Sequence, residues 1–274
     1  MIKNSLFFSM LETKFSSPRF NLLKTIWLNF RTLPFKQAYK LPILLYGYWN
    51  FRSLRGSIVL NTNNFSFGMV RLGLNYVGCV TSGVSTLTLL KGSKIYIDEK
   101  VRIAQGVSIC LYEDAELIFG YDSHLGDSTK VICAKRISIG KYSGITWECQ
   151  VMDHGSHYTF DKVERCVGRI IKPIVISDYC WVGNRTTIMP GTKLPPNTIV
   201  ASNSLLNKDY VGSGLEEYCL IGGQPARLIK KDIMRVYNRD NERDYNLYFR
   251  HSLEDTCFLS DESFKLEMDF RDSI

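Results

Sequence analysis

Two of the chain's four histidines, His154 and His157, stand close together, and Asp153 directly precedes them. An imidazole ionises near neutral pH, so histidine is the side chain best suited to move a proton during a reaction. Both histidines lie in residues 152–175, MDHGSHYTFDKVERCVGRIIKPIV, which interrupt a regular pattern on either side. A long excursion from a regular frame usually carries function. We therefore predict that residues 152–175 form an extruded functional loop.

The pattern around this loop is a six-residue repeat. An aliphatic residue recurs at every sixth position from Ile176 to Val200. This period fits neither a helix nor a single strand, but it fits short strands and tight turns stacked into a coil with the aliphatic residue inward. The same period occurs earlier in three runs, at Ile97, Ile103 and Ile109, then at Phe119, Leu125 and Val131, and, after two extra residues, at Ile139, Ile145 and Val151. The repeat predicts a mainly β solenoid over residues 56–206, in which residues 66–90 fit only loosely.

Residues 1–55 lack the repeat and are strongly basic, with nine Lys and Arg residues against the single acid Glu12. Basic and apolar residues alternate there, which predicts one or two amphipathic helices broken at Pro34 and Pro42. Such a segment can cap the open end of a solenoid or lie on an anionic membrane surface. No nucleic-acid-binding motif accompanies the charge, so we expect no nucleic-acid partner.

Residues 232–274 also lie outside the repeat and hold eleven acidic and six basic residues. Their many aromatic side chains are unusual for a solvated tail. We expect this extension to pack on an oligomer, to shape the acceptor site, or to pair with the basic N-terminal segment.

The cysteines argue against a structural metal site. Eight are scattered singly, without a CxxC pair, whereas zinc clusters need closely spaced ligands. Free thiols are typical of a reducing cytoplasm. Neither a secretory signal nor an apolar run long enough to span a membrane is visible, so we expect a cytoplasmic protein without a metal.

Three segments resemble the hexapeptide-repeat acyltransferases, in particular the branch of maltose, galactoside and polysaccharide O-acetyltransferases. CWVGNRTTIMPG is similar to the family's Trp-(Ile/Val)-Gly segment followed by Pro-Gly, MDHGSH to its Asp-x-x-x-His element, and LIGGQPARLIKK to its closing Gly-x-Pro-Ala-(Lys/Arg) turn. With the repeats, these segments cover about residues 56–231. The resemblance implies a left-handed parallel β-helix over this range, and a homotrimer with sites between neighbouring subunits.

The resemblance also implies transfer of an acetyl group from acetyl-CoA to a sugar hydroxyl of a capsule, lipopolysaccharide or other glycan. By motif position, His157 is the expected general base and His154 is its competitor. The hydroxyl would attack the thioester directly, without an acyl-enzyme. The second imidazole nitrogen needs a partner, for which Asp153, Glu148 or a backbone carbonyl are open alternatives. An oxyanion donor is expected as well, but the sequence does not identify it.

Residues expected to contact CoA follow from the same resemblance. Trp181 and Gly183 would flank the pantetheine arm, where a glycine permits close approach of the backbone. Basic residues near the chain's closing turn would meet the nucleotide phosphates, although a solvated basic face is the alternative. The full set is Trp181, Gly183, Asn184, Ser202, Asn207, Lys208, Arg227, Lys230 and Lys231.

Two other functions remain open from the sequence. An amine needs less activation than a hydroxyl, so N-acetylation of an amino sugar or an antibiotic is an alternative reaction. The fold could also serve as a non-catalytic trimeric scaffold.

Overall fold

The computed structural model describes residues 19–62, 64–75 and 83–260. The chain divides into two compact units, Met1–Ile233 and Met234–Ile274. Some residues that entered the charge and aromatic counts, Lys3, Glu12, Lys14, Phe264 and Phe270, lie outside the described part.

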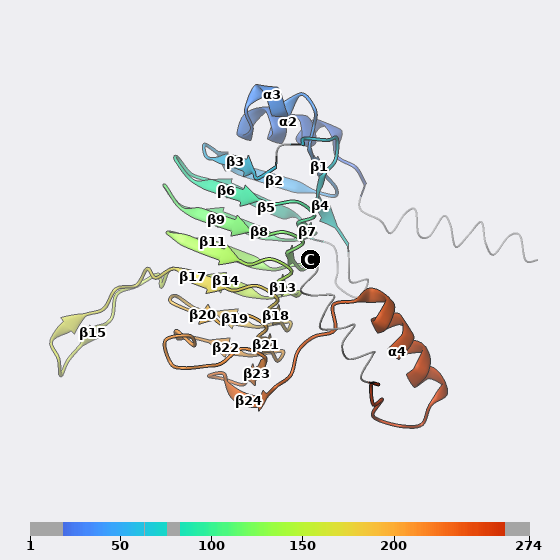
Figure 1. The fold of residues 1–274 in the computed structure, drawn as a ribbon. Coiled ribbons are helices and arrows are strands. Elements are labelled where there is room, and N and C mark those ends of the chain that lie inside the picture. Colours follow the sequence, from blue (N-terminus) through green and yellow to red (C-terminus); the bar gives the residue numbers. More distant parts are fainter. Residues whose placement is uncertain (1–18, 63, 76–82, 261–274) are drawn as a thin grey trace, which may run out of the picture. The chain divides into compact units, whose positions relative to one another are not determined.

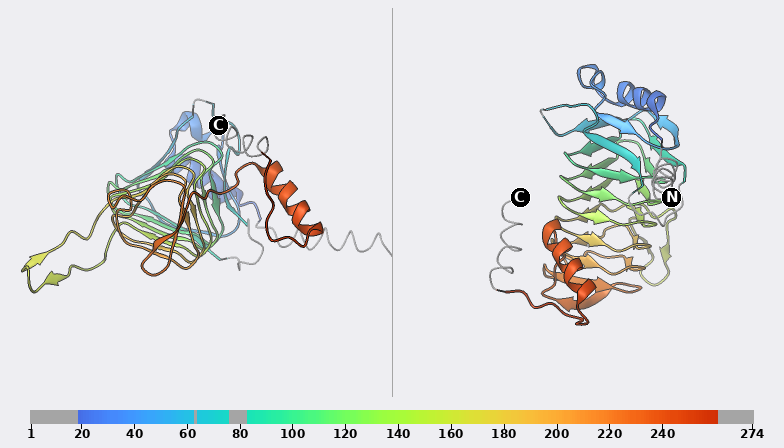
Figure 2. Two further views of the ribbon diagram at one scale, coloured as in Figure 1. Left: turned by 60° about the horizontal axis from the view of Figure 1, so that its bottom comes forward. Right: turned by 90° about the vertical axis from the view of Figure 1, so that its right-hand side faces the viewer.

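The first unit is a left-handed parallel β-helix, as the sequence predicts (Figure 1). Its coils contribute short strands to three sheets, which form the sides of a triangular prism (Figure 2). The nine-stranded sheet holds, in spatial order, β1 (Ile43–Leu45), β4 (Val70–Leu74), β7 (Arg102–Ala104), β10 (His124–Leu125), β13 (Gly144–Ile145), β18 (Trp181–Val182), β21 (Ile199–Val200), β23 (Cys219–Gly222) and β24 (Arg227–Lys231).

The other two sides are seven- and six-stranded in the described residues. The seven-stranded sheet holds β2 (Trp49–Leu54), β5 (Ser85–Leu89), β8 (Ser108–Leu111), β11 (Lys130–Cys133), β14 (Gln150–Met152), β19 (Thr187–Ile188) and β22 (Leu205–Leu206). The six-stranded sheet holds β3 (Ser57–Leu60), β6 (Lys94–Ile97), β9 (Glu116–Phe119), β12 (Arg136–Ile139), β17 (Ile174–Ile176) and β20 (Lys193–Leu194).

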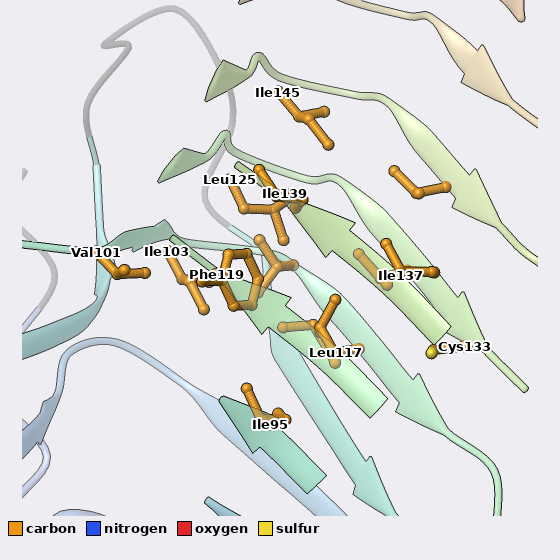
Figure 3. Packing of buried hydrophobic residues seen from close by; sticks show 14 of the residues in the cluster. Ile95, Val101, Ile103, Leu117, Phe119, Leu125, Cys133, Ile137, Ile139 and Ile145 are labelled. Carbon is orange, nitrogen blue, oxygen red and sulfur yellow. The ribbon is translucent and has the colours of Figure 1, made fainter. Parts of the chain in front are cut away.

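The repeat residues fill the inside of this prism. Ile103, Leu125 and Ile145 lie above one another in register on β7, β10 and β13, and each is at most 2% exposed. Figure 3 shows them packed against Phe119 and Ile139 from the six-stranded sheet. A single coil cannot bury its apolar side, so neighbouring coils stabilise one another. The inward column predicted from the hexads is confirmed.

The N-terminal helices cover the first coil. α2 (Leu22–Thr32) is followed at Pro34 by α3 (Phe35–Ala38). The stack begins earlier than expected, because β1 and β2 both lie within residues 1–55, which the sequence assigned to a helical segment. Among the described residues, no helix is long and apolar enough to cross a membrane.

The interruption of the repeat is an extruded arm. It leaves the prism between β14 and β17, and its far end is a two-stranded hairpin of β15 (Phe160–Asp161) and β16 (Cys166–Val167) (Figures 1 and 2). In the second unit, α4 (Arg239–His251) begins at Asn238, whose side chain accepts hydrogen bonds from the amides of Asp240 and Asn241.

Candidate active site

The root of the arm is held by a buried carboxylate. Asp153 is 0% exposed, and its oxygens accept hydrogen bonds from the backbone amides of Ala134, Lys135 and Arg136 at 2.6, 2.8 and 2.8 Å. Its own carbonyl accepts from the amide of Lys172 at the returning end of the arm, at 3.0 Å. Hydrogen bonds from amides to an ionised group are strong and directional. Asp153 therefore ties the arm to the preceding coil.

His157 lies four residues beyond this root and is exposed, whereas His154 is half-buried at the root itself. The ring of Tyr112 meets the His154 ring edge-on, with centroids 5.6 Å apart. The Asp153 carboxylate is thus directed to the backbone of the preceding coil. Of the two histidines, His157 is the more accessible.

Trp181 is presented on the outer face of the nine-stranded sheet, and its side chain is 38% exposed. Strand register aligns it with Ile199, Leu220 and Lys230 on the three following strands. Residues paired in this way share one face of a sheet, and strands are spaced by about 4.8 Å, so Trp181 and Lys230 are about 14 Å apart. A straight path thus leads from Trp181 to the cations of β24.

Next to Trp181, Gly144 leaves room for a histidine of the preceding coil. A Cβ at position 144 would lie 2.0 Å from Cε1 of His124, so the imidazole occupies the space that a side chain would take. His124 and Trp181 thereby flank the glycine on one face.

Gly183 has a packing reason for its lack of a side chain. A Cβ there would lie 2.5 Å from the backbone nitrogen of Ser202 in the next coil. This contact gives the glycine a packing reason beside the expected approach of the pantetheine arm, which stays a prediction. Asn184 and Ser202 do come together, with the Ser202 hydroxyl donating to Oδ1 of Asn184 at 2.5 Å. They lie at the corner between the nine- and seven-stranded sheets.

The remaining residues expected to contact CoA form two groups. Arg227, Lys230 and Lys231 are exposed on β24, and Lys231 donates to Glu216 at 2.9 Å, which raises the lysine pKa. Asn207 and Lys208 follow β22 at another corner, where the Lys208 ammonium lies 5.1 Å from the centroid of the Tyr210 ring.

The candidate residues occupy different sides of the prism. The arm that carries His157 leaves the corner between the seven- and six-stranded sheets, which is opposite the nine-stranded sheet that carries Trp181 (Figure 2). The apolar core lies between them. Asn207 lies at the same corner as the arm, whereas Asn184 lies at the corner between the nine- and seven-stranded sheets. One chain therefore does not bring His157 and Trp181 together.

Sequence reasoning missed an aromatic stack beside Trp181. The rings of Tyr142 and Tyr179 are stacked with centroids 5.1 Å apart, and Tyr121 meets Tyr142 edge-on at 5.4 Å. Burial, followed by the neighbouring tyrosines, raises the pKa of Tyr142 to about 12. A signal was available, because Tyr142 and Tyr179 each stand two residues before an outward position of the nine-stranded sheet, Gly144 and Trp181.

Curated relatives match parts of the chain, whereas no family model matches it. The chain is 28% identical over 205 residues to an uncharacterized 24.8 kDa protein in the cps region of Klebsiella pneumoniae, covering 74% of this chain and 86% of that protein. It is 39% identical over 57 residues to a chloramphenicol acetyltransferase of Klebsiella aerogenes, which is 21% of this chain and 25% of that protein. The chain thus spans about a quarter of the chloramphenicol acetyltransferases that it matches.

A putative lipopolysaccharide biosynthesis O-acetyl transferase of Escherichia coli strain K12 is 24% identical over 135 residues, which is 46% of this chain and 66% of that protein. Among solved structures, the polysialic acid O-acetyltransferase OatWY shares the fold with a TM-score of 0.53 and 21% identity, covering 73% of this chain and 98% of that chain. By these relatives and by the shared fold, the chain is similar to hexapeptide-repeat acyltransferases.

Proposed function

We propose that the protein transfers an acetyl group from acetyl-CoA to a hydroxyl of a saccharide, with His157 as the general base. The observation that carries this proposal is an exposed imidazole on an arm whose root is fixed by a buried carboxylate. A base that removes the proton of a hydroxyl during attack typically contributes about 10²–10⁴ in rate. The saccharide acceptor is supported by the relatives named for lipopolysaccharide and polysialic acid O-acetylation.

In this reaction the hydroxyl oxygen attacks the thioester carbonyl while its proton passes to the imidazole of His157. Collapse of the tetrahedral intermediate releases CoA as a thiolate, which takes the proton back from the imidazolium. Every bond is then accounted for without an acyl-enzyme. Asp153 contributes by positioning, since it fixes the backbone from which His157 extends.

The CoA arm would run along the outer face of the nine-stranded sheet. Trp181 offers an apolar surface at one end of this path, and Lys230 offers a cation at the other. Arg227 and Lys230 are available for phosphates, whereas Lys231 already has a carboxylate partner. Asn184, Ser202, Asn207 and Lys208 stay candidates for the remaining CoA contacts.

A complete site then needs two chains, because the core separates His157 from Trp181 within one chain. We propose that His157 of one subunit meets the Trp181 face of the next in a homotrimer. This arrangement can be tested by mixing His157→Ala and Trp181→Ala chains during refolding. Random assembly of a cyclic oligomer would restore about a quarter of the sites. Activity of the mixture no higher than that of either variant would contradict a shared site.

The reaction itself is tested by incubating the full chain with acetyl-CoA and candidate acceptors, then measuring released CoA and product mass. We expect His157→Ala to lower turnover by about 10²–10⁴, with an unchanged oligomer. Wild-type turnover of this variant would refute the assignment. Mild alkali removes an O-acetyl ester but leaves an N-acetyl amide, so alkali-stable product would indicate the alternative N-acetylation. The chloramphenicol acetyltransferase relatives make this antibiotic a second acceptor to include.

A further inference from the structure

The helix that caps the β-helix buries three polar side chains and leaves several large apolar ones exposed. The buried face of α2 consists of Thr25, Leu28, Asn29 and Thr32, each at most 4% exposed. These positions follow the i, i+3, i+4, i+7 spacing of a single helix face. A surface helix of a globular protein normally turns apolar side chains inward, whereas three of the four buried residues of α2 are polar.

The buried polar groups are used to close the first coil. Asn29 donates to the carbonyl of Ile43 at 2.7 Å and accepts from the amide of the same residue at 3.2 Å. The Thr25 hydroxyl accepts from the amide of Leu45 at 3.0 Å. These bonds satisfy the edge of β1, which would otherwise be exposed at the end of its sheet. Capping therefore explains the inner face of α2, but it does not explain the outer one.

The outer face carries large apolar side chains that the described residues leave in solvent. Leu23 is 80% exposed, Trp27 is 62% and Phe30 is 47%. Phe30 meets Phe35, which is 74% exposed, edge-on at 5.9 Å. Helical geometry puts Leu23, Trp27 and Phe30 on one face at i, i+4 and i+7. A contiguous patch of this kind marks an interaction surface.

The charge around this patch has a single sign. Arg31, Lys36 and Lys40 are exposed on the same cap. No acidic residue occurs between Glu12 and Asp98, so 85 consecutive residues contain basic charge alone. A second copy of this face would bring like charges together, which opposes self-association. An anionic surface with an apolar interior, by contrast, would accept both the apolar side chains and the basic charge around them.

We infer that the outer face of α2 docks on a bilayer that contains anionic lipids. Leu23, Trp27 and Phe30 enter the boundary between headgroups and acyl chains, while Arg31, Lys36 and Lys40 contact the headgroups. Aromatic and aliphatic side chains beside Lys and Arg are typical of helices that lie in a membrane interface. The His157 arm begins after β14. In the seven-stranded sheet, β14 lies four strand spacings from β2, which corresponds to about 19 Å along the stack.

Sedimentation of the full chain with vesicles measures this docking. Vesicles with about 30 mol% phosphatidylglycerol in phosphatidylcholine should bind the protein, and pure phosphatidylcholine should bind it far less. Neutralising Arg31, Lys36 and Lys40 to Ala should weaken binding about 100-fold, from about fivefold for each charge. Added salt should weaken it too, since it screens exposed charges. The Leu23→Ser/Trp27→Ser/Phe30→Ser variant should lose binding.

A matched control removes apolar side chains from the second unit. Leu253→Ser/Phe258→Ser changes residues that are 103% and 92% exposed, and it should bind vesicles like the wild type. Trp27→Phe should bind as well, but it should lose the blue shift and the brominated-lipid quenching that Trp27 gives on docking. Circular dichroism and thermal unfolding check that each variant is folded.

Three outcomes would overturn the inference. The first is absence of binding, or equal binding to the two kinds of vesicle. The second is a larger assembly that the Leu23→Ser/Trp27→Ser/Phe30→Ser variant dissociates while vesicles capture neither protein, which would assign the face to a second copy. The third is cross-linking of Lys36 or Lys40 to acidic residues of 232–274 without vesicle binding, which would assign it to the chain's own extension. Docking and catalysis are separable, because His157→Ala should still bind vesicles.

Discussion

Replacing Asp153 by Ala separates a positioning role from a catalytic one. Asp153 is 0% exposed, and the substitution removes the acceptor of its three part-buried hydrogen bonds from backbone amides. An unsatisfied buried amide costs about 1–3 kcal/mol. For three amides we expect the free energy of unfolding to fall by about 3–5 kcal/mol, which is near the low end of the summed range. A chain of this size loses about 2–4 °C of melting temperature per kcal/mol, which predicts a decrease of about 6–20 °C.

Asp161→Ala is the matched control in the same arm. Asp161 also accepts two amide hydrogen bonds, from Val163 and Glu164 at 2.9 Å each, but it lies exposed at the far hairpin. We therefore expect its melting temperature to stay close to that of the wild type. Circular dichroism during heating and release of CoA from acetyl-CoA are measured on both variants and on His157→Ala.

The positioning role and the catalytic role of Asp153 predict different effects of Asp153→Ala on stability. If Asp153 positions the arm, Asp153→Ala loses stability and activity together, whereas His157→Ala loses activity alone. If Asp153 instead orients the reacting imidazole, its variant would melt like the wild type and lack activity. That second result would refute the reasoning from the three amide contacts.

Three more predictions concern packing, thiol reactivity and pH. Gly183→Ala should lower stability by about 1–3 kcal/mol, because the new methyl group meets the backbone of Ser202; an unchanged urea midpoint would contradict that contact. Burial raises the pKa of Cys180 to about 12, so iodoacetamide near neutral pH should alkylate exposed Cys166 and reach Cys180 only after unfolding, as peptide mass spectrometry can check. The Tyr142 pKa of about 12 exceeds the ordinary value of about 10, so the folded state retains this proton longer and stability should fall as pH rises from 10 towards 12; Tyr142→Phe should flatten this fall in urea titrations.

The β-helix could be predicted from the sequence because the six-residue repeat marks the positions whose side chains are buried. Each sixth residue points inward, and the burial of Phe119, Leu125 and Val131 confirms the register read from their spacing. The break after Val151 likewise located the arm, since 152–175 matched no coil. The start of the stack was missed, because β1 and β2 are separated from the regular hexads by a stretch with irregular spacing.

Site residues were harder to assign, since a motif gives spacing along the chain but no direction in space. Asp153 and His157 stand four residues apart, yet one is buried in a corner and the other is exposed. Gly183 was expected to admit a ligand close to the backbone, and only the structure shows that the next coil also requires a glycine there. Trp181 and His157 belong to neighbouring motifs, but three-sided coiling sends them to opposite sides of the prism.

The sequence by itself determined the period, the inward column and the position of the interruption, because these depend on residues close together in the chain. Only the tertiary structure decided which side chains face one another, because those contacts join residues one coil apart or more. It also decided that α2 turns its polar face inward. Both faces of that helix are visible in the sequence, but the unpaired edge of β1 selects which one is buried.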